Sequence, residues 1–129
     1  MIAPRLVIAG ICLPFLFSGV AKLLDFNGAV AEFAHFGFAV PAVFAALTIA
    51  LQLGGSVAAI ALRSTPAILA ALALAAFTVA ATVIAHAFWT FEGLARIQHT
   101  NIFVEHLSIA FALVFVAWWN WRPRERRPA

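Results

Sequence analysis

The sequence predicts an all-α integral membrane protein, a four-helix bundle with a short amphipathic helix at the membrane interface between helices 1 and 2. Its 129 residues are 65% hydrophobic and only 10% charged, whereas soluble domains average about 45–50% and about 25%. The apolar residues form four continuous runs, each long enough to cross about 30 Å of hydrocarbon as a helix. A transmembrane β-barrel is excluded, because its strands would alternate in hydrophobicity over about ten residues.

Helix signals mark the ends of these runs. Pro41 suits the first turn of the second helix, where a backbone N–H is not needed. Ser64 and Pro66 are typical of an N-cap followed by the first turn of the third helix. We expect one domain over residues 1–129, with helices at about residues 6–24, 41–62, 66–89 and 101–121 and a basic cytoplasmic tail at residues 122–129.

The connection between the first two helices, residues 25–40, has a helical pattern of its own. Phe26, Val30 and Phe33 recur at helical spacing, which is typical of an amphipathic helix that lies at the outer interface. Gly37 is placed to end this helix. We therefore expect a short helix here rather than an extended loop.

The charged residues indicate orientation and exclude some partners. Arg5, Arg63 and the arginines of the tail would lie on one side of the membrane, so the positive-inside rule places both termini in the cytoplasm. No nucleic-acid partner is expected, because neither a basic groove nor a stacking motif accompanies the net charge of +3. A cleaved signal peptide is the alternative for the first run, but that run exceeds the usual length of about 7–15 residues. Cys12 is the single cysteine, which excludes an internal disulfide.

Polar side chains follow one face of each helix at i, i+3 or i+4 spacing, and they are the main functional signal because polar groups are costly in a membrane. We expect the four stripes to meet inside the bundle, in a pocket that opens toward the outer face and is closed by apolar packing on the cytoplasmic half. Phe15, Phe17, Phe88 and Trp89 would supply its apolar walls. The candidate ligand-pocket residues are Ser18, Lys22, Gln52, Thr82, His86, Trp89, Asn101 and Glu105.

Each titratable candidate residue has both a structural and a functional interpretation. A carboxylate such as Glu105 inside a bundle would seek a cation, and Lys22 or Arg96 is the natural partner. The result would be either a structural ion pair or a site for a ligand and proton transfer. His86 has a structural alternative as well, a hydrogen bond to a neighbouring helix. His86 and His106 lie at similar depth, but no other haem signal accompanies them, and we expect neither a haem nor a metal site.

Five motifs occur in an order that resembles the DoxX family. Phe17-Ser-Gly-Val-Ala-Lys-Leu23, followed by Asp25-Phe26, is similar to the family signature SGxxKL-x-D/N-F. The other four are Phe33-Ala-His-Phe-Gly37 ahead of Pro41, Leu51-Gln-Leu-Gly-Gly55, His86-Ala-Phe-Trp89 and Asn101-Ile-Phe-Val-Glu-His-Leu107. The resemblance covers about residues 5–121. The sequence departs from the pattern at Gln52, where many members carry glutamate, and at Glu105-His106, where many carry Lys-Asn.

The resemblance implies a small multi-pass protein of the bacterial cytoplasmic membrane that is associated with a membrane redox system. Some family members resemble subunits of a thiosulfate:quinone oxidoreductase. The pocket would then hold a quinone, with no covalently bound cofactor, and the partners would be the lipid bilayer, an oxidoreductase subunit and a second copy of the chain. The alternative is a non-catalytic subunit or docking module whose polar stripes only hold the bundle together, and enzyme activity is left open. Transport is disfavoured, because four helices without an inverted repeat are too few for alternating access.

Overall fold

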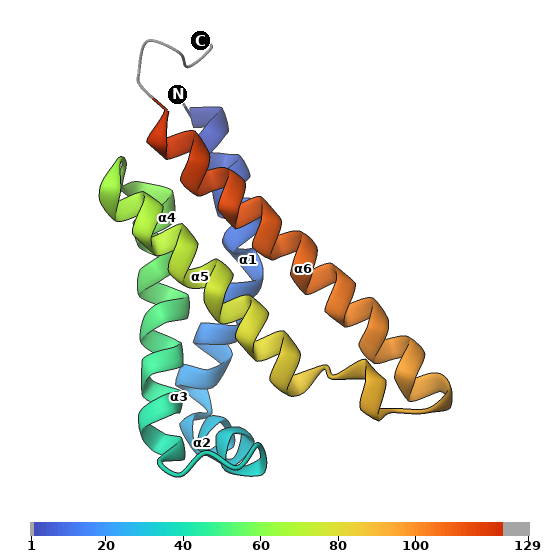
Figure 1. Cartoon of the computed structure of the whole chain (residues 1–129). Coiled ribbons are helices and arrows are strands. Elements are labelled where there is room, and N and C mark those ends of the chain that lie inside the picture. The colour runs from blue at the N-terminus through green and yellow to red at the C-terminus, as the bar shows by residue number, and fades with distance from the viewer. Residues whose placement is uncertain (1, 123–129) are drawn as a thin grey trace.

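The computed structural model describes residues 2–122, and every regular element in that range is a helix, with no strand among them. This confirms the predicted all-α class. The elements, shown in Figure 1, are α1 (Ile2–Leu24), α2 (Phe26–His35), α3 (Pro41–Ala50), η1 (Leu51–Gly55), α4 (Ser56–Ala61), α5 (Thr65–Ala85), η2 (Phe88–Thr90) and α6 (Gly93–Trp121).

Within the described residues, four helical spans are long and apolar enough to cross a membrane, as predicted. α1 and α6 form one span each, α3, η1 and α4 join into a second, and α5 continues through η2 to form the third. The start of α1 and the end of α6 lie at one end of the bundle, the terminal end. α2 and the α5–α6 connection lie at the opposite, distal end (Figure 1). Of the predicted basic tail, all but Arg122 falls outside the described residues.

The last helix is longer than predicted, since α6 begins at Gly93 rather than near residue 101 and has 29 residues. Gly93 has a φ of +58°, which glycine adopts without steric cost, so the chain turns there directly into the helix. At 1.5 Å per residue α6 is about 43 Å long and extends beyond about 30 Å of hydrocarbon. Its first turns lie outside the hydrocarbon and carry polar residues such as Arg96 and His99. The prediction followed the apolar run alone and therefore placed the start of the helix too late.

The short helix between the first two spans is present as predicted. α2 begins after Asp25, whose Oδ1 accepts a hydrogen bond of 2.9 Å from the backbone N–H of Gly28, an N-cap. It ends at His35, two residues before Gly37, which has a φ of +81°. Backbone bonds from Gly37 to Ala34 and from Phe38 to Phe33 complete a Schellman motif. Both ends of α2 are thus set by local sequence, which fixes its direction across the distal end.

The hydrophobic core fills the middle and the terminal half of the bundle. Cys12, Leu74 and Leu113 come from three different helices and are completely buried there. Ala59 and Ala71 are also buried, and such small residues allow membrane helices to approach closely. Buried polar side chains such as Thr48, Gln52 and Thr82 lie toward the distal half, although Asn120 is buried near the terminal end of α6.

The second span contains a π-helical turn, η1, that the sequence did not predict. Such turns insert an extra residue into a helix and often occur at functional sites. α1 packs against this turn through Gly19, where an added Cβ would lie 2.7 Å from Leu53 Cδ2 and 3.2 Å from Gln52 Cβ. A side chain at position 19 would therefore force Leu53 or α1 to shift, and glycine avoids this. Gln52 of the same turn is buried, with 5% of its surface exposed.

Candidate ligand-binding site

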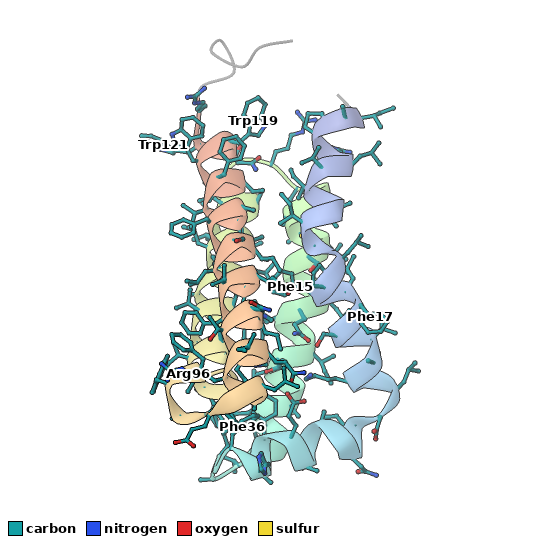
Figure 2. The ribbon with its side chains drawn as sticks, turned by 90° about the vertical axis from the view of Figure 1, so that its right-hand side faces the viewer. Phe15, Phe17, Phe36, Arg96, Trp119 and Trp121 are labelled. Carbon is teal, nitrogen blue, oxygen red and sulfur yellow. The ribbon has the colours of Figure 1, made fainter. Side chains whose placement is uncertain are left out.

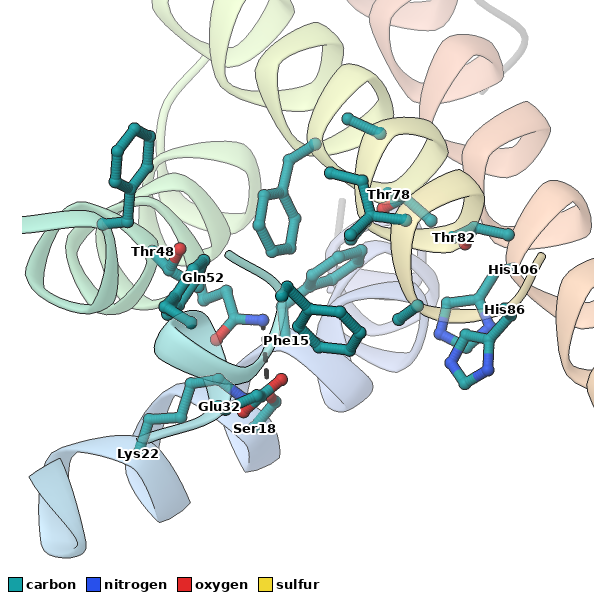
Figure 3. A pocket seen from close by; sticks show the side chains of 18 of the residues that line it. Phe15, Ser18, Lys22, Glu32, Thr48, Gln52, Thr78, Thr82, His86 and His106 are labelled. Carbon is teal, nitrogen blue, oxygen red and sulfur yellow. Dashed lines mark hydrogen bonds and ion pairs between the residues drawn. The ribbon is translucent and has the colours of Figure 1, made fainter. Parts of the chain in front are cut away.

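A cavity of about 520 Å³ occupies the distal half of the bundle (Figure 3). Ligand pockets in proteins commonly have volumes of about 300–1,000 Å³, so the cavity can hold a small organic molecule. It is lined from α1, α2, α3, η1, α5 and α6. Its lining residues are Pro14, Phe15, Ser18, Lys22, Glu32, Phe33, Phe36, Phe38, Phe44, Thr48, Gln52, Phe77, Thr78, Ala80, Ala81, Thr82, Ile84, Ala85, His86, His106 and Ile109.

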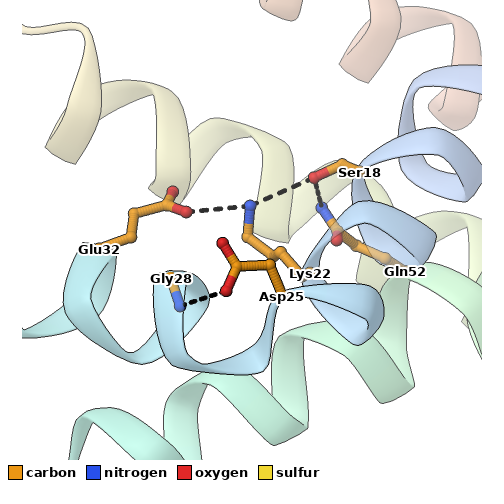
Figure 4. Close-up of polar contacts among 6 residues, drawn as sticks. All are labelled: Ser18, Lys22, Asp25, Gly28, Glu32 and Gln52. Carbon is orange, nitrogen blue, oxygen red and sulfur yellow. Dashed lines mark hydrogen bonds and ion pairs between the residues drawn. The ribbon is translucent and has the colours of Figure 1, made fainter.

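A connected polar group lies on one side of the cavity, where α1, α2 and η1 meet (Figure 4). Lys22 Nζ lies 3.1 Å from Glu32 Oε2 and donates a hydrogen bond of 3.3 Å to Ser18 Oγ. Gln52 Nε2 donates a second bond of 3.3 Å to the same oxygen. Because Ser18 Oγ accepts twice, its own hydroxyl proton is available to a further acceptor. This side of the cavity therefore offers hydrogen-bond donors to a ligand oxygen.

Two polar atoms on the cavity wall are buried without a hydrogen-bond partner among the described residues. They are Gln52 Oε1 and Thr82 Oγ1, from side chains only 5% and 1% exposed. By contrast, Thr78 lies one turn from Thr82 and donates a 2.7 Å bond to the backbone carbonyl of Leu74. Leaving a buried polar group unpaired costs about 1–3 kcal/mol. A ligand in the cavity would supply the missing partner to either atom once its side chain turns toward the cavity.

Aromatic rings form the distal wall of the cavity. Phe33 of α2 packs edge-on against Phe38, with 5.1 Å between ring centroids, and Phe38 lies 4.6 Å from Phe44 of α3. Phe36 also reaches this wall, whereas Phe15 enters the cavity from α1 (Figure 2). The walls are thus mainly apolar, with polar groups at separate positions, an arrangement typical of small-molecule sites.

Three histidine rings gather on the opposite side of the cavity, where α5 ends and α6 begins. His86 Nδ1 lies 3.1 Å from His99 Nδ1, and the His86 ring stacks on that of His106 with 5.4 Å between centroids. His86 follows the last residue of α5 and lines the cavity together with His106. We call these three residues the histidine cluster.

The structure brings together five of the eight predicted pocket residues and separates three. Ser18, Lys22, Gln52, Thr82 and His86 line the cavity, whereas Trp89, Asn101 and Glu105 do not.

Asn101 and Glu105 lie exposed on α6, so the prediction that all four polar stripes meet inside is wrong for this helix. The buried face of α6 runs through Ala110, Leu113 and Ala117. His106 extends that face toward the cavity, and Glu105 points about 100° away from it. The predicted ion pair between Lys22 and Glu105 does not form, because Glu105 lies on the exposed face of α6. Lys22 pairs with Glu32 instead.

The predicted aromatic walls are also corrected. Phe17 is 80% exposed and points away from the bundle (Figure 2). Phe88 and Trp89 pack on the ring of Phe103 rather than lining the cavity. Phe15 alone of the four expected rings lines it. The helix of α5 ends at Ala85, so the chain that carries Phe88 and Trp89 turns away from the interior.

Sequence reasoning missed several residues of the site, including Glu32 and the Phe33–Phe38–Phe44 wall. It also missed His99, which does not line the cavity but contacts His86. The spacing of His99 and His106 was a usable signal, because residues seven apart lie on the same face of a helix. Phe33 and Phe38 could not be assigned to a cavity from spacing, because the Schellman turn decides which way they point.

Compared with known protein families, residues 3–87 match the family described as DoxX, which is more than half of the chain. The chain belongs to the DoxX family. No curated protein and no solved structure matches it. The matched range of this DoxX protein contains Lys22, Gln52, Thr82 and His86, so most of the cavity lies in the family region. α6 lies beyond that range, and the resemblance noted for residues 101–107 stays a prediction.

The chemistry of the DoxX cavity follows from these groups. Lys22 and the Ser18 hydroxyl can donate to a ligand oxygen, Gln52 Oε1 can accept from a ligand hydroxyl, and the Thr82 hydroxyl can do either. Among residues 2–122, no group of three or more His, Cys, Asp or Glu side chains is placed to hold a metal ion. The site is suited to a mainly apolar molecule that carries polar atoms on two sides.

Proposed function

We propose that this DoxX protein binds a quinone-type ring in its distal cavity and serves a membrane redox system. The bacterial cytoplasmic membrane is the proposed location, with both termini in the cytoplasm and the cavity toward the outer face. The basic residues support this orientation. Arg5, Arg63 and Arg122 lie toward the terminal end, and positive charge is enriched on the cytoplasmic side of membrane proteins.

The observation that carries the proposal is the pair of buried, unpaired polar atoms, Gln52 Oε1 and Thr82 Oγ1, in a cavity with aromatic walls. A ring with oxygens at opposite positions would accept a hydrogen bond from Thr82 and, in its reduced dihydroxy form, donate one to Gln52 Oε1, while its body packs on phenylalanines. A quinone has this form, and it accepts two electrons and two protons when it is reduced. The family's link to quinone-linked oxidoreductases supports the same class of ligand.

The residues of the chain would hold the ring and its protons. Lys22 and Ser18 would donate hydrogen bonds to an oxygen on the α1 side, and Thr82 would donate to one on the α5 side. His86 lines the cavity on that second side and can exchange a proton with the ligand. The described chain has no group that carries electrons, so a partner oxidoreductase would supply them.

Replacing Thr82 by valine tests the proposal at one atom. We expect the affinity for decylubiquinone to fall about two- to tenfold, because the variant loses one hydrogen bond and such a bond contributes about 0.5–1.5 kcal/mol. Stability should not fall, because the substitution removes an unpaired buried hydroxyl and nearly conserves volume. The measurement is native mass spectrometry of the protein titrated in nanodiscs.

Thr78→Val is the matched control, because Thr78 also lines the cavity but its hydroxyl already bonds to Leu74 O. Its affinity for decylubiquinone should remain close to that of the wild type. Equal affinities for wild type and Thr82→Val would contradict the proposed site, as would a wild-type protein that binds no quinone.

A second candidate, a docking module for a partner subunit, is favoured by the outer surface of α6. Asn101, Glu105 and Ser108 are exposed there at i, i+4 and i+7 on one face of the helix. A carboxylate on the lipid-facing side of a span is costly unless it pairs. A partner helix, from an oxidoreductase subunit or a second copy of the chain, would cover this stripe.

Glu105→Leu tests this candidate. We expect the variant to lose its partner or dimer, seen as a lower mass in native mass spectrometry from membrane fragments. The thermal unfolding midpoint of the isolated chain should stay equal or rise, because an exposed charge is replaced by an apolar side chain. Glu92→Leu, at an exposed position just before α6, is the control. An assembly that survives Glu105→Leu unchanged argues against docking through this stripe.

A further inference from the structure

The histidine cluster connects the cavity to the distal end of α6. His86 and His106 line the cavity, whereas His99 does not. His99 lies seven residues before His106 on α6, about 10 Å closer to the start of the helix. Its ring stacks on Phe91 with 3.9 Å between centroids and 7° between planes. This contact holds His99 in place beside His86, between the cavity and the distal surface.

The two facing nitrogens of His86 and His99 require a shared proton. Their Nδ1 atoms are 3.1 Å apart, and a hydrogen bond forms only when one nitrogen carries the proton and the other offers a lone pair. Two neutral rings therefore adopt opposite tautomers across this contact. Either ring can be the donor, so one proton has two positions along the line between the rings.

His106 differs from this pair. Its Nδ1 lies 2.7 Å from the backbone carbonyl of Ile102, and a carbonyl oxygen can only accept, so Nδ1 of His106 carries a proton. The ring is thereby held in one tautomer and does not share a proton with His86, on which it stacks. Among residues 2–122, the titratable side chains that contact the His86 ring are His99 and His106, both from α6.

We propose that His99 and His86 form a proton relay that carries protons from the aqueous phase at the distal end into the cavity. A proton from water binds Nε2 of His99, and the proton on Nδ1 of His99 moves to Nδ1 of His86. Nε2 of His86 then releases its proton to an oxygen of the bound ligand. One proton enters and one leaves, and no electron moves between the rings. Each ring then returns to its first tautomer by releasing a proton from one nitrogen to water and taking up a proton at the other nitrogen from water on the same side, so the reset moves no net proton between the rings.

The relay deepens the proposed function and rests on it, because a quinone-type ligand takes up protons when a partner oxidoreductase supplies electrons. The proposal concerns His99 above all. His99 does not line the cavity, so it acts through His86, and its loss should leave ligand affinity unchanged while it slows proton delivery.

The first test needs no ligand. In protein labelled with ¹⁵N-histidine and embedded in nanodiscs, the shared proton should give a measurable coupling between the two Nδ1 nuclei across the hydrogen bond. His99→Gln should abolish this coupling, and His35→Gln should leave it intact, because His35 is exposed on α2 and away from the cluster. Absence of the coupling in the wild-type protein overturns the relay.

The second test measures proton delivery to bound decylubiquinone after pulse-radiolytic reduction, followed by absorbance. We expect His99→Gln to bind decylubiquinone with unchanged affinity and to slow protonation of its oxygen at least tenfold, while His35→Gln matches the wild type. His99→Ala should be equally slow, and added imidazole should restore the rate, which a purely structural role of His99 would not predict.

The outcomes separate the two proposals. Binding with unchanged protonation in His99→Gln overturns the relay and leaves the proposed function standing. A wild-type protein that binds no quinone overturns the proposed function, and the relay to a quinone with it, even if the coupling between the nitrogens is observed.

Discussion

Replacing Gly19 by leucine should destabilise the bundle more than any other single change considered for this protein. An added Cβ would lie 2.7 Å from Leu53 Cδ2 and 3.2 Å from Gln52 Cβ, and the rest of a leucine side chain needs still more room. α1 would have to move away from η1. Overpacking of this kind costs about 1–3 kcal/mol, and we expect the thermal unfolding midpoint in detergent to fall accordingly.

Gly10→Leu is the matched control for this prediction. Gly10 lies on the same helix, and nothing lies within 4 Å of an added Cβ there. Both substitutions raise helix propensity by about 1 kcal/mol, so the difference between them isolates the contact with η1. Equal unfolding midpoints for the two variants would show that α1 does not pack on the π-helical turn. Gly19→Leu should also weaken decylubiquinone binding, because Gln52 is displaced.

Gln52→Leu should have the largest effect on ligand binding. Gln52 lines the cavity, is 5% exposed, bonds to Ser18 Oγ through Nε2, and has no hydrogen-bond partner at Oε1. Oε1 can only accept a hydrogen bond, so it distinguishes the reduced, dihydroxy form of the ligand from the oxidised form, which has no donor. We expect affinity for the reduced form to fall about tenfold or more, with a smaller loss for the oxidised form.

The stability of Gln52→Leu should stay close to that of the wild type, because the change removes an unpaired buried carbonyl. Affinity for both forms is measured in nanodiscs under oxidising and reducing conditions. Gln98→Leu, an exposed glutamine on α6, is the control and should bind both forms as the wild type does. An equal loss for the two forms would mean that Oε1 does not accept from the ligand.

The three predicted stripes that line the cavity share a simple physical origin. Ser18 and Lys22 on α1, Gln52 on η1, Thr82 on α5 and His86 just after α5 all line the cavity. A polar side chain in a span is costly in hydrocarbon, and the sequence pattern alone reports which face carries it. That reasoning failed for α6, because its buried face continues from His106 through Ala110 and Leu113. A difference of one position along a helix rotates a side chain by about 100° around the helix axis. Apolar residues surround α6 on all sides, so the sequence pattern does not show which face is buried.

The ion pair of Lys22 also depends on a feature that the sequence pattern does not report, the rotation of α6. The sequence places Lys22 near the distal end of α1, where a carboxylate must be close if the charge is to be paired. Glu32 forms this ion pair. Asp25 caps the start of α2, and α2 then runs across the distal end of the cavity, where Glu32 reaches Lys22. Glu105 is a carboxylate at similar depth, but α6 presents it to the outside. The choice between two carboxylates depends on helix rotation, which composition does not report.

The sequence by itself determined that this is a membrane protein with four spans, a short capped helix between the first two, and membership of the DoxX family. Local signals suffice for these features, because span length, caps and motifs depend on residues close together in the chain. Only the tertiary structure decided which polar groups meet. The π-helical turn that carries Gln52 inward, the close approach at Gly19 and the meeting of His86 with His99 all depend on how the helices rotate and cross. These contacts join residues far apart in the sequence, and packing between whole helices sets them.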